Sequence, residues 1–97
     1  MEVNIKALHF EASAALEGFI NKKSEKLLRR YPAITLFDYI LKVVKPETSM
    51  NKEATIKVVV PQYDDFVATK VADTFEEAID LGLDAIERQL ERKLKAK

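Results

Sequence analysis

The chain has 97 residues, of which 47% are hydrophobic and 33% charged, and its 16 Lys and Arg residues balance its 16 Asp and Glu residues. This length supports one small core, and the hydrophobic content excludes an intrinsically disordered protein. There is no Cys and no run of about 18 apolar residues, which excludes disulfide frameworks, thiolate metal sites and membrane-spanning helices. The opening MEVNIKALHF lacks the features of a signal peptide. We therefore expect a cytoplasmic protein with a single domain over residues 1–97.

The first third of the chain predicts a strand followed by a helix. In residues 2–10 apolar and polar residues alternate, which is the period of a strand with one buried face. From about residue 13 to residue 31 the apolar residues recur at helical spacing, and Ser13 can serve as the N-cap. Pro32 ends this helix because it cannot continue the backbone hydrogen bonding. The apolar side of the predicted helix consists of Leu16, Phe19, Ile20, Leu27 and Tyr31.

Three further strands are predicted in the middle of the chain. Residues 34–45 are rich in β-branched and aromatic side chains and precede the turn-forming sequence PETSMN. Residues 53–61 and 65–72 have the same character and are joined by the short turn QYDD. We therefore expect an antiparallel meander of three strands.

Both faces of the first meander strand are apolar. One face carries Phe37, Tyr39, Leu41 and Val43, which we interpret as core residues together with Phe19 and Ile86. The opposite face carries Leu36, Ile40 and Val44. The sequence does not decide which face meets the helices.

A second helix closes the chain. Thr74 and Glu77 form a capping box, in which the hydroxyl accepts from a backbone N–H and the carboxylate reaches back. The helix is predicted to run to about residue 95, with an apolar stripe of Phe75, Ile79, Gly82, Leu83, Ile86, Leu90 and Leu94. The order β-α-β-β-β-α predicts an α+β fold with a four-stranded mixed sheet. Its first two strands pair in parallel through a right-handed crossover, which leaves both helices on one face.

Positive charge is concentrated in two segments. Residues 21–30 and residues 88–97 each contain five cations and one anion, so each has a net charge of +4 and the rest of the neutral chain carries −8. On helical wheels these cations form two bands. The first band consists of Lys22, Lys26 and Arg29, and the second of Arg88, Arg92 and Lys95.

An acidic band lies between the second basic band and the apolar stripe of the last helix. It consists of Glu76, Asp80, Asp84, Glu87 and Glu91. Acids at the start of a helix and bases at its end complement the helix dipole, which explains part of this pattern. If the helices lie side by side, however, the two basic helix ends line a surface suited to phosphates. RNA is a natural partner, because recognition of shape and phosphate needs no base-specific groups.

The two helices also resemble a known family. The sequences EASAALEGFINKKSEKL and AIDLGLDAIERQLERKLK, together with the element order, resemble the hibernation-promoting factor and ribosome-associated inhibitor family, also called sigma-modulation or ribosomal subunit interface proteins. The most specific part is the spacing between Ala78-Ile79-Asp80 and Arg88-Gln89-Leu90. The resemblance implies binding to the small ribosomal subunit and its rRNA, over the channel for tRNA and messenger RNA. It also implies that translation is held off in stress or stationary phase.

The resemblance and the charge pattern together give a set of candidate RNA-binding residues. The basic positions of the family map onto Lys23, Lys26, Arg88 and Arg92, and the complete set is Lys22, Lys23, Lys26, Arg29, Arg30, Arg88, Arg92 and Lys95. Ala85 stands where many members have a Lys, which removes one phosphate contact. The resemblance is to the short form, without the C-terminal dimerisation domain of the long form. Pairing of ribosomes would then need a separate dimerising factor.

No enzyme site is predicted. His9 is the only histidine, so neither a His-metal cluster nor a Ser-His-Asp triad can form. Asp64 and Asp65 are interpreted as part of a solvated turn. We expect no catalytic residue, cofactor, metal, small-molecule substrate or membrane partner. The alternative function is a protein-interaction or dimerisation module that uses the apolar residues on the second face of the sheet.

Overall fold

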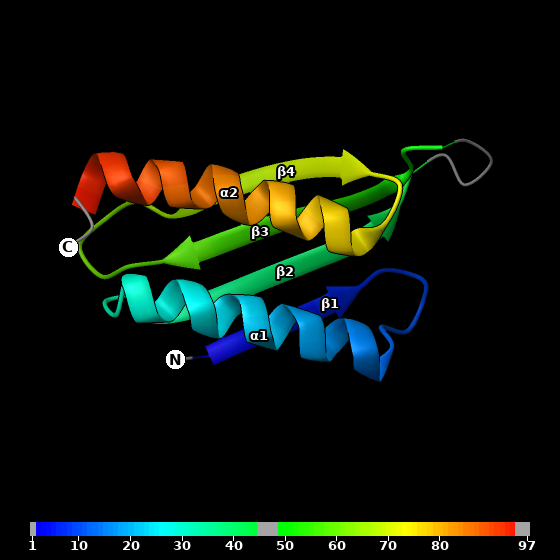
Figure 1. Ribbon diagram of the computed structural model, residues 1–97, viewed down its shortest axis with the longest axis horizontal. Helices are drawn as coiled ribbons and strands as arrows, with labels where there is room; N and C mark the ends of the chain where they lie inside the picture. Colours follow the sequence, from blue (N-terminus) through cyan, green and yellow to red (C-terminus); the bar gives the residue numbers. More distant parts are fainter. Residues whose placement is uncertain (1, 45–48, 95–97) are drawn as a thin grey trace.

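The structure, a computed structural model, describes residues 2–44 and 49–94. Its elements are β1 (Glu2–Ala7), α1 (Ala14–Arg30), β2 (Leu36–Val43), β3 (Lys52–Val59), β4 (Phe66–Ala72) and α2 (Phe75–Leu94). The strands form one sheet in the order β1-β2-β3-β4, in which β1 and β2 are parallel and the other pairs antiparallel. Both helices cover the same face of this sheet (Figure 1). The predicted α+β fold and element order are confirmed.

Both helices begin at the predicted hydroxyl caps. Ser13 Oγ accepts a hydrogen bond from Leu16 N at 3.0 Å, and Thr74 Oγ1 accepts one from Glu77 N at 3.1 Å. Because a capped helix start fixes where the chain leaves the sheet, these two residues set the entry points of α1 and α2. The first strand is shorter than predicted. It ends at Ala7, and two residues later His9 has a left-handed backbone with a φ of 67°.

One face of the sheet packs against the helices. Phe37, Tyr39 and Leu41 are completely buried, so this is the core face that the sequence left open. The prediction was wrong for Val43, which is 39% exposed because it lies opposite Lys52 in the last pair of the β2–β3 ladder. Ile86 is completely buried as expected, whereas Phe19 lies at the edge of the core and is half-buried.

The two helices lie side by side and run in the same direction (Figure 1). Their C-terminal halves, which contain the two basic segments, are at the same end of the molecule. This follows from the topology, because each helix returns along the sheet after a strand that runs the opposite way. The fold therefore brings the two regions of positive charge to one end of the helical layer.

Candidate nucleic-acid interface

The outer side of α1 carries a cationic hollow. It has a volume of about 410 Å³, and its described lining consists of Phe19, Lys22, Lys23, Lys26 and Arg29, with no carboxylate. Lys22, Lys26 and Arg29 are exposed, and the half-buried Phe19 ring lies 5.5 Å from Lys23 Nζ. The ring therefore provides an apolar surface among four positive charges. We call these five residues the α1 hollow.

A second, charge-balanced groove lies between the helices. It is lined by Lys23, Lys26, Leu27 and Arg30 from α1 and by Asp80, Leu83, Asp84 and Glu87 from α2. Lys23 Nζ lies 3.1 Å from Asp80 Oδ1, and Arg30 is paired with Glu87. Both partners of the second pair lie seven residues, about two helical turns, beyond those of the first. The parallel helices are therefore in register for repeated ion pairing.

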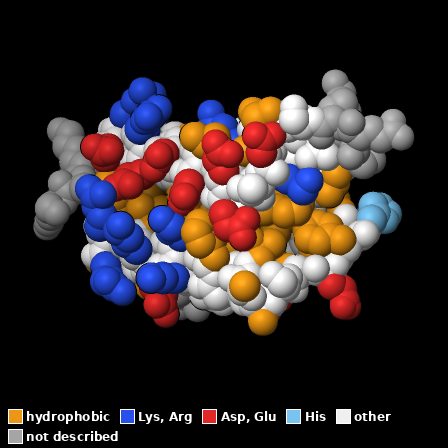
Figure 2. Space-filling model, turned by 45° about the vertical axis from the view of Figure 1, so that its right-hand side comes forward, with side chains coloured by type: hydrophobic (Ala, Val, Ile, Leu, Met, Phe, Trp, Pro, Cys, Tyr) orange, Lys and Arg blue, Asp and Glu red, His pale blue; other side chains and the backbone are white. Residues whose placement is uncertain are grey.

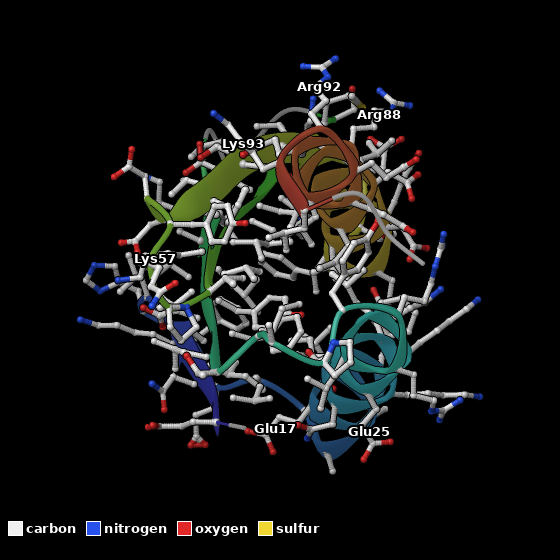
Figure 3. The ribbon with its side chains drawn as sticks, turned by 90° about the vertical axis from the view of Figure 1, so that its left-hand side faces the viewer. Glu17, Glu25, Lys57, Arg88, Arg92 and Lys93 are labelled. Carbon is white, nitrogen blue, oxygen red and sulfur yellow. The ribbon has the colours of Figure 1, made fainter. Side chains whose placement is uncertain are left out.

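We call Asp80, Asp84 and Glu87 the acidic row. This row lies between the cations of α1 and a separate group of cations on α2 (Figure 2). Arg88 and Arg92 point away from α1, on the far side of α2 (Figure 3). The two basic segments share one end of the molecule, but negative charge separates them.

The negative potential of this region also acts on Tyr31. This residue follows α1 and is buried, and burial raises the pKa of its hydroxyl. Glu91 and Glu87 raise the pKa further, because they disfavour a phenolate, whereas Arg30 opposes them. The carboxylates of α2 thus raise the pKa of Tyr31 by more than Arg30 lowers it.

Two cations of α2 lie beside the β3–β4 turn. Arg92 and Lys93 line a hollow together with residues of that turn. Lys93 is absent from the candidate set predicted from the sequence, because it lies outside the band of Arg88 and Arg92 on the helix. Its proximity to the turn depends on tertiary packing, which no local pattern reports. Lys95 lies outside the described residues.

Ala85, where the family resemblance leads one to expect a Lys, is half-buried and packs against the core. Its methyl group therefore adds apolar contact at the position where the resemblance led us to expect a cation.

The open face of the sheet is mostly polar. Lys42 Nζ lies 3.5 Å from Glu53 Oε2, and the hydroxyls of Thr55 and Thr69 lie 3.1 Å apart. Ile40 is exposed, but the strand register places it between Lys6 and Thr55. Of the other two residues of the alternative hypothesis, Leu36 is half-buried opposite Val59, and Val44 is half-buried beyond the end of β2. Polar neighbours therefore interrupt the apolar surface at Ile40.

Over residues 2–44 and 49–94, no cluster of three or more His, Asp or Glu residues is arranged to hold a metal ion. No helix in the same ranges is both long and apolar enough to cross a membrane.

Comparison with known families gives a match along almost the whole chain. The model of the family described as Sigma 54 modulation protein / S30EA ribosomal protein matches residues 3–97. The chain belongs to this family. It is a family of ribosome-associated modulation proteins, a non-enzymatic kind. The sequence resemblance is therefore confirmed at the level of the family.

Two solved structures have the same fold. The chain resembles a ribosomal subunit interface protein from Coxiella burnetii with a TM-score of 0.83 and 21% identity, covering 95% of this chain and 96% of that one. It also resembles the N-terminal domain of Thermus thermophilus Protein Y with a TM-score of 0.78 and 20% identity, covering 95% and 98%. No curated protein matches the chain. At these identities the likeness is one of fold.

Proposed function

We propose that this protein binds the small ribosomal subunit in the cytoplasm, over the tRNA and messenger RNA channel, and holds off translation. In this proposal the α1 hollow and the exposed cations of α2 contact the phosphates of rRNA. Family membership supports a ribosomal partner.

The observation that carries the proposal is the α1 hollow. Its described lining holds four cations, and of these only Lys23 is paired with a described carboxylate, in a chain of zero net charge. Electrostatic attraction decays over about 8 to 10 Å at physiological salt, so a partner responds to this local charge and not to the net charge. Each phosphate contact releases condensed counterions and adds salt-dependent affinity.

The cations of α1 differ in whether a carboxylate pairs with them. Lys23 and Arg30 are engaged by carboxylates of α2, whereas Lys22, Lys26 and Arg29 form no ion pair with a described residue. We therefore expect the last three residues to contribute most to RNA binding by α1. Lys23 and Arg30 mainly hold the two helices in register.

Co-sedimentation with ribosomes and separated subunits, across a salt series, tests the proposal. We expect saturable pelleting with the small subunit that weakens as salt rises, and little pelleting with an unrelated structured RNA. Absence of pelleting even at low salt would contradict the proposal. Binding to the large subunit alone would contradict the part that concerns the site.

Two charge-matched triple variants identify the interface. Lys22→Gln/Lys26→Gln/Arg29→Gln removes three charges from the α1 hollow, and Lys6→Gln/Lys42→Gln/Lys57→Gln removes three from the open face of the sheet. The first variant should weaken small-subunit binding at least about 100-fold. The slope of the logarithm of its binding constant against the logarithm of the salt concentration should be smaller in magnitude by about two. The second should bind like the wild type. Equal losses of small-subunit affinity in the two variants would mean that total charge, and not the α1 hollow, determines binding.

A further inference from the structure

A hollow of about 390 Å³ lies beside α2, on the side away from α1. One wall is the β3–β4 turn and the other is the end of the helix; its lining residues are Gln62, Tyr63, Asp64, Asp65, Phe66, Gln89, Arg92 and Lys93. We call it the turn hollow. Its volume is within the range of about 300 to 1,000 Å³ that is usual for small-ligand sites.

The two walls of the turn hollow are held in fixed positions. Gln62 has a left-handed backbone with a φ of 76°, and the N–H of Tyr63 donates to Val60 O at 3.1 Å. Gln89 Nε2 donates to Val67 O at 3.0 Å, which joins α2 to β4. The hollow is therefore formed before any ligand arrives, and binding need not order it.

Charges of opposite sign face the turn hollow without pairing. Asp64 and Asp65 come from the turn, Arg92 and Lys93 come from the helix, and all four are exposed. Within the described part of the chain, none of them forms an ion pair. A complementary ligand carries an anionic group at one end and hydrogen-bond donors at the other.

An aromatic ring forms part of the same wall. Tyr63 is 43% exposed, and its ring centroid lies 6.3 Å from that of Phe66, which is buried beneath it. Bases stack on aromatic side chains whatever their sequence, because every base has a π-face. Tyr63 thus offers a supported ring face between the two groups of charges.

We propose that the turn hollow binds one unstacked nucleotide of a single-stranded RNA segment, with a preference for a base that carries an exocyclic amino group. The base stacks on Tyr63, its amino group donates to Asp64 or Asp65, and its phosphate contacts Arg92 and Lys93. Carboxylates suit cytosine because N4 is a donor, whereas uracil presents an acceptor there. The inference rests on the proposed function, since Arg92 belongs to the proposed RNA interface, and it adds recognition of a base to recognition of phosphate.

NMR titration of the full ¹⁵N-labelled chain with tetracytidylate and tetrauridylate tests this proposal. The two RNAs have the same length, charge and ring size, so their affinity ratio reports the pairing edge of the base, where N4–H₂ and N3 of cytosine are replaced by O4 and N3–H of uracil. We expect tetracytidylate to shift the amides of residues 62–66 and 89–93, and to bind about fivefold more tightly than tetrauridylate. Equal affinities would overturn the proposal. So would shifts confined to Arg92 and Lys93 that inorganic phosphate reproduces, because these would indicate a phosphate contact only.

Variants separate stacking from hydrogen bonding. Tyr63→Ala should lower the affinity for both RNAs about fivefold or more. Tyr63→Phe keeps the ring and should bind both RNAs like the wild type. Asp64→Ala/Asp65→Ala, which removes the carboxylate acceptors, should abolish the preference for tetracytidylate. An unchanged affinity ratio in this double variant would overturn the role of the carboxylates. These titrations use the isolated chain and short RNA, so their result does not depend on whether the protein binds ribosomes.

Discussion

Ser24 of α1 and Tyr39 of β2 are hydrogen-bonded in the core, with Ser24 Oγ 2.7 Å from Tyr39 OH. Both residues are completely buried. Ser24 Oγ donates its only hydrogen to Ile20 O at 2.8 Å, so the Tyr39 hydroxyl is the donor to Ser24. This chain of two hydrogen bonds connects the helix that carries the α1 hollow to the centre of the sheet.

We predict that Ser24→Ala destabilises the protein more than Tyr39→Phe. Ser24→Ala leaves a buried tyrosine hydroxyl without a partner, which costs about 1 to 3 kcal/mol. Tyr39→Phe removes the donor while Ser24 still donates to Ile20 O, and we expect a loss of about 0.5 to 1.5 kcal/mol. Urea unfolding followed by circular dichroism measures both. The prediction fails if Tyr39→Phe is the more damaging change.

The same pair predicts a loss of stability at alkaline pH. Burial raises the pKa of Tyr39 to about 12, from an ordinary value of 10.0. Between pH 10 and pH 12 the folded protein therefore retains the Tyr39 proton, whereas the unfolded chain loses it. The contribution of Tyr39 to the free energy of unfolding is complete below pH 10 and declines as the pH rises toward 12. In Tyr39→Phe the decline should be shallower. It should not disappear, because the pKa of Tyr31 is also raised. Equal slopes in the two proteins would contradict this assignment.

The fold was predictable because its signals are local. Ser13 and Thr74 cap the helices as expected, and the order of the elements follows from the change between periods of two and 3.6. The interpretation of Phe37, Tyr39 and Leu41 as core residues is confirmed, although the opposite face of β2 is also apolar in sequence and Val43 was assigned wrongly. The exposure of Val43 depends on its place at the end of the β2–β3 ladder, a property of the assembled sheet.

The candidate site was predictable only in part. The helical wheel grouped Lys22, Lys26 and Arg29, and these three residues line one hollow. It did not distinguish them from Lys23, which is paired with Asp80 across the groove. That distinction depends on the register between two helices, which brings together Lys23 and Asp80 from positions 57 residues apart in sequence. Local periodicity contains no information about it.

The acidic row should limit binding to unrelated polyanions. Asp84 lines the interhelical groove beside Lys26 and forms no ion pair with a described residue. Asp84→Asn thus removes a repulsive charge without breaking a pair, and we expect affinity for an unrelated duplex RNA to rise about two- to fivefold at low salt. Asp80→Asn/Glu87→Gln should have a larger effect, because it releases Lys23 and Arg30. Fluorescence anisotropy in a salt series measures both.

A matched control separates the acidic row from total charge. Glu11→Gln/Glu17→Gln removes two exposed carboxylates elsewhere, and Glu17 lies on the side of α1 away from α2 (Figure 3). Affinity for duplex RNA should change much less in this variant than in Asp80→Asn/Glu87→Gln. If the affinity for duplex RNA rises equally in the two double variants, net charge governs binding to unrelated RNA and the acidic row has no special role.

The two helical glycines should respond in opposite ways to alanine. A Cβ at Gly18 would have no atom within 4 Å apart from its chain neighbours and the backbone of its own helix, so Gly18→Ala should stabilise the protein by about 0.5 to 1 kcal/mol through helix propensity. A Cβ at Gly82 would lie 2.7 Å from Cδ1 of the completely buried Ile56. There the cost of overpacking, about 1 to 3 kcal/mol, exceeds the gain in propensity, and we expect a net loss of about 1 kcal/mol. Urea unfolding of the two variants gives the comparison. An equal gain at both positions would mean that Ile56 adopts another rotamer, and that α2 could approach β3 as closely without a glycine.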